Sequence, residues 1–206
     1  MNVKILKRFV IYMAILTFVM FTAWALVKSF INRPPGDYET EVCGMRLKDK
    51  LYDKAIEAAN IALEKMPNHR GAIMCKALVF ISQNMYLKAN KELNYLINFL
   101  ENNLESDDKT GIGTLAAAYA NRGIVKDRNK DYQGALEDYV KALGIDEEAV
   151  AGPGLGTIIL NYKFKSSSVL ERALYLNEQL QLPENERVLS IKELDEGQVM
   201  HKPSKL

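Results

Sequence analysis

Residues Tyr119–Asp146 read YANRGIVKDRNKDYQGALEDYVKALGID, the segment with the clearest structural pattern in the chain. Apolar and small residues recur at helical spacing on either side of a short polar turn, which predicts two amphipathic helices in a hairpin. The pattern repeats upstream, because Tyr52 and Tyr86 lie 34 residues apart and Tyr132 takes the same role after an insertion of 12 residues. A fixed period of this length, built from two helices, indicates a solenoid of stacked hairpins.

The pattern resembles the tetratricopeptide repeat over about half of the chain, in residues 36–103 and 116–149. The third unit carries the most specific match, with Asn121-Arg122-Gly123, Asp131-Tyr132 and Ala135-Leu136-Glu137-Asp138-Tyr139. The first unit departs from the family pattern at Cys43, and the second lacks the terminal proline that Pro67 supplies in the first. The resemblance implies a non-enzymatic binding scaffold whose first helices line a concave groove for a partner protein.

We therefore expect an all-α protein with an N-terminal transmembrane helix and a solenoid of three repeats plus a degenerate closing unit. Small residues such as Gly123 are expected where helices cross, and Leu104–Thr114 is expected to be a solvated loop that accounts for the insertion. A capping box, Ser168-x-x-Glu171, predicts a helix in the closing unit. The expected boundaries are 1–32 for the basic leader and anchor, 33–35 for a hinge, 36–182 for the solenoid (36–69, 70–103, 116–149 and 153–182), and 183–206 for a polar tail. Within that tail a short helix is allowed near 184–191, and the last residues are expected to be disordered.

The segment Phe9–Val27 runs for 19 residues without a charge and follows a basic leader. At 1.5 Å per residue such a helix spans a bilayer core of about 30 Å, so we expect membrane insertion through residues 9–31. The basic leader favours a cytoplasmic N-terminus and an extracytoplasmic, periplasmic solenoid, although Lys28 and Arg33 weaken the asymmetry. The alternative is a signal peptide cleaved after Ala25, which would release a soluble exported binding protein.

The overall composition excludes several classes of protein. A net charge of +1 disfavours a dedicated nucleic-acid binder, and two cysteines exclude a disulfide-dense secreted scaffold. Cys43 and Cys75 fall on adjacent first helices, but Cys43 is expected to face its own second helix, so a disulfide is left open. His69 and His201 are far apart in sequence, and no zinc-type spacing exists. No metal or cofactor is expected.

Two candidate catalytic patterns are weak. The segment at 152–156, GPGLG, lacks the Lys-Ser/Thr pair of a phosphate loop and follows no strand, so it is interpreted as a helix-breaking connector. An enzyme that used it would bind nucleotide. Glu137 and Asp138 are expected on a solvated face, which gives paired-carboxylate chemistry little support.

The candidate partner-binding groove combines an apolar strip with polar residues of the third unit. The strip suits an apolar partner segment, and its methionine adds adaptability. The alternative is that the C-terminal region or neighbouring helices cover the strip. Self-association, through the transmembrane segment or the exposed edge of the solenoid, is also left open. The candidate residues are Met74, Leu78, Ile81, Asn121, Ile124 and Arg128.

Overall fold

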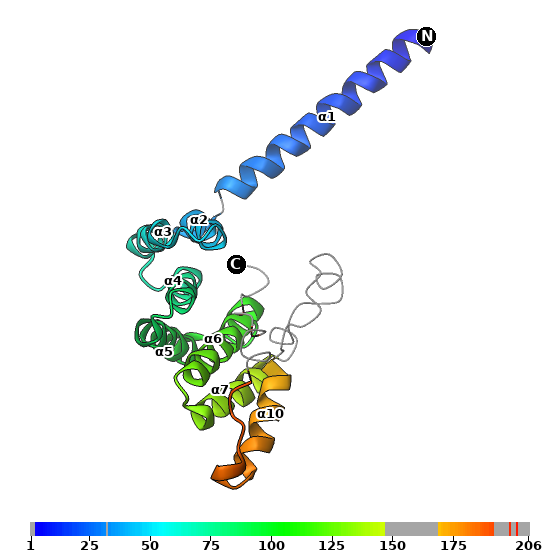
Figure 1. Ribbon diagram of the computed structural model, residues 1–206. Helices are drawn as coiled ribbons and strands as arrows, with labels where there is room; N and C mark the ends of the chain where they lie inside the picture. The colour runs from blue at the N-terminus through cyan, green and yellow to red at the C-terminus, as the bar shows by residue number, and fades with distance from the viewer. Residues whose placement is uncertain (1–2, 32, 147–168, 192–197, 199–200, 202–206) are drawn as a thin grey trace. The chain divides into compact units, whose positions relative to one another are not determined.

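A computed structural model describes residues 3–31, 33–146, 169–191, 198 and 201. The regular elements within these ranges are all helical (Figure 1). The chain divides into two compact units, Met1–Pro35 and Gly36–Leu206. We describe each unit by itself.

The first unit contains α1, Val3–Ile31, which is long and apolar enough to cross a membrane. A signal sequence would satisfy the same criterion. The two threonines in the helix do not leave their hydroxyl groups unsatisfied, because Thr17 Oγ1 donates to the carbonyl of Met13 at 2.8 Å and Thr22 Oγ1 to that of Phe18 at 3.0 Å. Such bonds to the preceding turn make threonine tolerable in a lipid-exposed helix.

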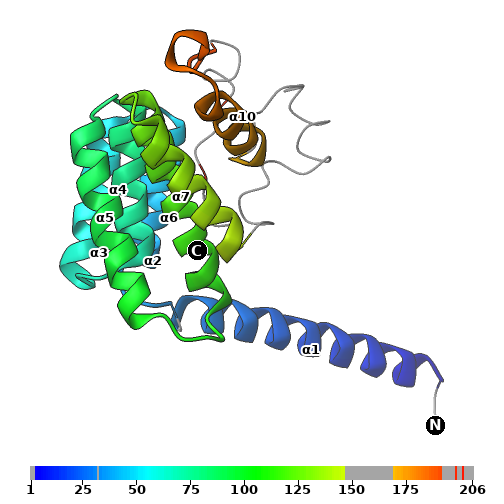
Figure 2. The same ribbon diagram turned by 90° about the horizontal axis from the view of Figure 1, so that it is seen from below.

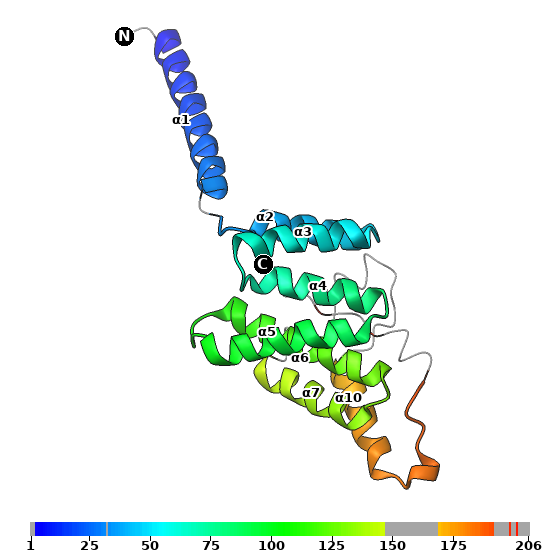
Figure 3. The same cartoon turned by 90° about the vertical axis from the view of Figure 1, so that its left-hand side faces the viewer.

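The second unit is a stack of helical hairpins. Helix α2 packs against α3, α4 against α5 and α6 against α7, and the first helices of neighbouring hairpins also touch (Figure 3). Helix α10 then packs on α7 (Figure 2). The bounds are α2 Asp37–Lys48, α3 Tyr52–Lys65, α4 Arg70–Ser82, α5 Tyr86–Asn103, α6 Lys109–Arg128, α7 Tyr132–Ile145 and α10 Val169–Gln181, followed by the 3₁₀ helix η1 Glu184–Glu186.

The turns inside the three hairpins are built alike. Lys50, Asn84 and Lys130 adopt left-handed backbone conformations, with φ of 58°, 57° and 65°. In each turn the next residue donates its N–H to the carbonyl five residues back, as Asp131 does to Lys126 at 2.9 Å. This Schellman-type closure ends the first helix and starts the second at the same point of every hairpin. The repeat is therefore present in the backbone as well as in the sequence.

Small residues lie where helices cross, as predicted. Ala55, Ala89 and Ala135 are fully buried on the second helices. A Cβ atom added to Gly123 would lie 2.5 Å from Cε1 of Tyr139, so α6 can approach α7 this closely only without a side chain there. The crossing predicted at Gly123 is confirmed.

The predicted loop at Leu104–Thr114 is wrong over most of its length. Helix α6 begins at Lys109, where Asp108 caps it by accepting the N–H of Gly111 at 2.8 Å. Gly111 fits because its missing side chain leaves room for Leu104, Asp108 and Arg70. The insertion therefore lengthens helices: α5 has 18 residues against 14 in α3, and α6 has 20 against 13 in α4.

The C-terminal region differs from expectation in two places. Helix α10 confirms the helix predicted after the capping box, but of the short helix predicted near 184–191 only the turn Glu184–Glu186 forms. The predicted disorder of the tail is wrong at His201, whose exposed fraction is 9%. The part of the closing unit before α10, residues 153–168, and the GPGLG segment lie outside the described residues.

Candidate functional site

The predicted apolar strip is not an open surface. Met74, Leu78, Ile81 and Ile124 have exposed fractions of 1% or less, because α4 packs against α2, α3, α5 and α6. Of the two interpretations that the sequence leaves open, a covered strip is the one that the burial supports. Arg128 is half-buried on α6.

Asn121 is the candidate groove residue with the most specific contacts. Its side chain is fully buried, and its amide pairs with the main chain of His201 at both ends. Asn121 Nδ2 donates to the carbonyl oxygen of His201 at 2.7 Å, and Asn121 Oδ1 accepts the N–H of His201 at 2.9 Å. A side-chain amide that pairs with both groups of one residue recognises the polypeptide main chain, whatever side chain that residue carries.

A second contact lies less than two turns further along α6. Gln198 Nε2 donates to Asp127 Oδ2 at 3.1 Å and to the hydroxyl oxygen of Tyr139 at 3.0 Å. Asn121 and Asp127 are six residues apart on α6, which corresponds to about 9 Å along the helix. Gln198 and His201 are three residues apart, and three residues of extended chain span at most about 10 Å, so the two pairs of residues match in spacing. Since Gln198 contacts Asp127 and His201 contacts Asn121, the two pairs run in opposite directions along the chain. We call Asn121, Asp127 and Tyr139 together the α6 site.

A buried ion pair with Arg172 fixes the position of the Asp127 carboxylate. Arg172 of α10 donates to both carboxylate oxygens, from Nε at 2.7 Å and from Nη2 at 2.8 Å, and its exposed fraction is 1%. Arg172 Nη2 also donates to the carbonyl of Leu189 at 2.9 Å, which ties the chain after α10 to the same carboxylate. The pair compensates two charges that burial alone would penalise heavily.

Tyr139 acts at the α6 site as a protonated hydroxyl. Burial, and then the charge of Asp127, raise the pKa of Tyr139 well above its ordinary value. Its hydroxyl therefore keeps its proton and donates to Asp127 Oδ2 at 3.2 Å, while its oxygen accepts from Gln198. The arrangement binds and orients polar groups and offers no free base or nucleophile.

Asp138 is buried, so the prediction that it lies on a solvated face is wrong, whereas Glu137 is exposed as expected. Asp138 accepts from Arg122 Nε and Nη2, each at 2.7 Å, and lies 2.9 Å from Lys126 Nζ. The hydrogen bond to Asp138 raises the pKa of Arg122 above its usual value. Asp138 thus contacts two cations of α6 and joins α7 to that helix.

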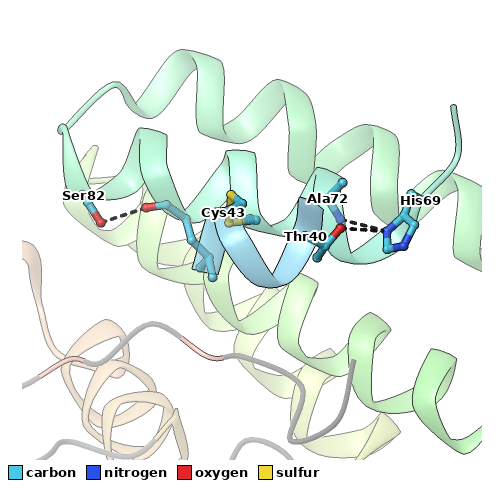
Figure 4. The surroundings of a disulfide bond; sticks show 7 residues. Thr40, Cys43, His69, Ala72 and Ser82 are labelled. Atoms are coloured by element: carbon cyan, nitrogen blue, oxygen red, sulfur yellow. Dashed lines mark hydrogen bonds between the residues drawn. A yellow bond between two sulfur atoms is a disulfide. The ribbon is translucent and has the colours of Figure 1, made fainter. Parts of the chain in front are cut away.

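Cys43 and Cys75 form a disulfide between α2 and α4, with their Cα atoms 6.4 Å apart (Figure 4). The prediction that Cys43 faces α3 is wrong, because its sulfur is bonded to α4. Beside the disulfide, His69 caps α4: its Nδ1 accepts the N–H of Ala72 at 3.2 Å and lies 3.4 Å from Thr40 Oγ1. The first and second hairpins are thus joined covalently and by a shared cap.

The site residues that sequence reasoning missed are Asp127, Tyr139, Gln198 and His201. Asp127 and Tyr139 are at ordinary repeat positions, and nothing local marks their polar ends as paired. Gln198 is 71 residues from Asp127 along the chain, and His201 is 80 residues from Asn121. No spacing rule connects positions so far apart. Within the described ranges no group of three or more histidine, cysteine or acidic residues could hold a metal ion.

A comparison with protein-family models finds no match for the chain, and a comparison with curated proteins finds none. The likeness to tetratricopeptide repeats therefore rests on the residues and on the hairpin geometry described above.

Proposed function

We propose that the protein is a non-enzymatic, membrane-anchored adaptor of the tetratricopeptide type, which binds a segment of a partner protein along α6. The observation that carries this proposal is the pairing of Asn121 with both main-chain groups of His201, at 2.7 and 2.9 Å. A buried amide placed in this way binds an extended polypeptide without reading its side chains. Repeat scaffolds use the surfaces of their stacked helices for such contacts.

The proposal places the folded unit outside the cytoplasm, in the assembly or maintenance of an envelope complex. The basic residues at the N-terminal end of α1, Lys4, Lys7 and Arg8, favour a cytoplasmic N-terminus. The buried disulfide adds support of a different kind, because disulfides persist in oxidising compartments and are rare in the cytosol. If the segment were instead cleaved after Ala25, the same unit would be a soluble exported binder. The mass of the mature chain separates these alternatives.

Site-specific photocrosslinking in native membranes tests the binding function. The crosslinking residue replaces Arg128, which is half-buried on α6 one residue past Asp127, and the matched control replaces Val140, which is 57% exposed on α7. We expect a partner polypeptide to crosslink at position 128 only, and to be lost when Asn121→Asp is added. Equal crosslinking from position 140, or crosslinking that survives Asn121→Asp in a folded chain, would contradict the proposal.

Protease accessibility tests the compartment independently. Digestion of the folded unit only after the outer envelope is permeabilised, from a chain of full-length size, would agree with an anchored periplasmic domain. Protection until the inner membrane is lysed would place the unit in the cytoplasm and remove the support that the disulfide provides.

A further inference from the structure

We propose that the segment containing Gln198 and His201 is a built-in mimic of the partner: it fills the α6 site, and a partner segment with the same pattern binds by displacing it. The pattern is a glutamine three residues before a residue with a buried, uncharged side chain. This inference rests on the proposed function and deepens it, since it names the chemistry of the partner segment and the step that controls its access.

The main-chain contact provides affinity without selectivity. Asn121 would pair equally with any residue that offers both an N–H and a carbonyl, so proline is the residue that it excludes. Because Asn121 is fully buried, an empty site would leave its Oδ1 without a hydrogen-bond partner and its Nδ2 with only the weak contact to Met74 Sδ at 3.5 Å. The α6 site therefore favours being filled, either by the chain's own segment or by another.

The side-chain contact at Asp127 selects a neutral donor. The carboxylate of Asp127 is already neutralised by the two bonds from Arg172. A lysine in place of Gln198 would bring a second cation beside Arg172, and a glutamate would place a carboxylate against Asp127; both repulsions act in a half-buried site. The amide of glutamine donates to Asp127 and Tyr139 with no net charge.

The position of His201 selects a side chain that can be buried without charge. Its exposed fraction is 9%, and burial lowers the pKa of His201 to about 4, so the imidazole is neutral near pH 7. A permanently charged arginine at this position would lose its hydration without a counter-charge. Partner segments with an aliphatic, aromatic or neutral polar residue here satisfy the same requirement.

Covalent attachment gives the chain's own segment a large advantage. Leu189 is held by Arg172, and Gln198 follows only nine residues later, so the effective concentration of the segment at the α6 site is in the millimolar range. A partner segment of equal intrinsic affinity must exceed that concentration or form additional contacts. Weakening the internal segment should therefore strengthen binding in trans.

The experiment uses the full chain in detergent micelles and a fluorescent synthetic peptide of residues 192–206, with binding read by anisotropy. The chain variant is His201→Pro, which removes the N–H that Asn121 Oδ1 accepts. We expect the peptide to bind this variant at least tenfold more tightly than it binds the wild-type chain. A peptide carrying Gln198→Glu should bind the variant at least tenfold more weakly than the unmodified peptide. Equal affinity for wild type and variant, or no effect of the peptide substitution, would overturn the proposal.

A second measurement covers the case in which His201→Pro does not fold. In the wild-type chain, NMR titration follows the imidazole of His201 with and without excess unlabelled peptide. Displacement should move its pKa from about 4 toward the ordinary 6.5, and an unchanged low pKa at saturating peptide would overturn the proposal. If a partner crosslinks at position 128 but the peptide never displaces the internal segment, the proposal of a partner mimic is wrong and the proposed adaptor function stands. If the peptide displaces the internal segment but no partner crosslinks, the proposed adaptor function is wrong, and the segment serves only an intramolecular contact.

Discussion

The first two hairpins and the C-terminal end of the stack are held together by different chemistry. Helices α2 and α4 are joined by the buried Cys43–Cys75 disulfide, in surroundings that are mostly apolar. At the other end, α6, α7 and α10 meet at a polar cluster, where Asp127 binds Arg172 and Asn121 binds His201. A disulfide in an oxidising compartment does not exchange on its own, whereas hydrogen bonds do. Ligand exchange is therefore expected at the C-terminal end, and the N-terminal end serves as its rigid support.

The largest effect is expected from breaking the polar cluster. Arg172→Met leaves the carboxylate of Asp127 buried without its cation, which should lower the free energy of unfolding by about 3–5 kcal/mol. Denaturant unfolding measures this loss. The paired change Asp127→Leu with Arg172→Met removes both charges and should recover most of it. If the free energy of unfolding of Arg172→Met lies within 1 kcal/mol of the wild-type value, the ion pair does not stabilise the packing of α6, α7 and α10.

Removal of the disulfide should lower the free energy of unfolding by a similar amount, while leaving the α6 site intact. Replacing both Cys43 and Cys75 by alanine releases a loop with a sequence separation of 32 residues, for which chain entropy predicts a loss of about 3–4 kcal/mol. Cys75 follows Met74, whose Sδ lies 3.5 Å from Asn121 Nδ2, but the hydrogen bonds between Asn121 and the main chain of His201 do not involve the disulfide. The low pKa of His201 should therefore survive in the folded variant. A pKa that rises to its ordinary value would show that the two ends are coupled, against the comparison above.

The crossing of α6 and α7 gives an intermediate effect with a matched control. Gly123→Leu forces a side chain into the ring of Tyr139 and should destabilise the unit by about 2–3 kcal/mol. Gly144 has nothing within 4 Å of an added Cβ, so Gly144→Leu on the neighbouring helix should stabilise slightly through helix propensity. Thermal unfolding compares the two variants. Equal changes in their melting temperatures would contradict the assignment of Gly123 to the crossing of α6 and α7.

Acid should weaken the contact between His201 and α6. The pKa of His201 is about 4 when buried and about 6.5 when released, so the released form binds more protons between these values. The stability of the contact is therefore complete above about pH 6.5 and falls as the pH drops toward 4, by about 2 kcal/mol at pH 5. A peptide of residues 192–206 that carries His201→Leu gives up no proton on binding, so its binding in trans to the wild-type chain, measured from pH 7.5 to 5, should strengthen accordingly. The same substitution in the chain removes the group that titrates and should remove that dependence; an equal dependence in that chain variant would assign it to another group.

The smallest effect concerns the hairpin turns. Lys130 holds a left-handed conformation, φ 65°, that costs a non-glycine residue about 1 kcal/mol. Lys130→Gly removes this cost but raises the conformational entropy of the unfolded chain, so the net stabilisation of the third hairpin should be about 0.5 kcal/mol. Asn84, at the equivalent turn, already tolerates this conformation, so Asn84→Gly should change the melting temperature less. A destabilising Lys130→Gly would show that the lysine side chain contributes to the turn.

The hairpins could be predicted because their information is local. The tyrosines at Tyr52, Tyr86 and Tyr132 are the first residues of α3, α5 and α7, as the period requires. Gly123 was predictable for the same reason, since a repeat that stacks needs a small residue at a fixed place in each unit. The start of α6 was not, because Gly111 and Gly113 resemble a loop in sequence, and the fit of Gly111 against Leu104, Asp108 and the distant Arg70 appears only in the tertiary structure.

The polar contacts of the site could not be predicted because they depend on long-range proximity. Asp138 has the sequence pattern of a solvated acid, and only the packing of α6 on α7 brings Arg122 to it. His201 lies in a polar segment whose composition predicts disorder, yet its main chain meets a buried amide 80 residues away. Asn121 was a candidate by its place in the repeat, but its ligand could come only from the tertiary structure.

Amide hydrogen exchange in the full chain, resolved to single residues, shows whether the segment with His201 occupies the α6 site. We predict that the N–H of His201 exchanges more slowly than in a free peptide of residues 192–206, because Asn121 Oδ1 accepts it at 2.9 Å. Asn121→Leu, which removes the acceptor, should abolish that protection and leave the amides of α2 and α4 unchanged. Exchange of the His201 amide at the free-peptide rate in the wild-type chain would contradict the claim that this segment occupies α6.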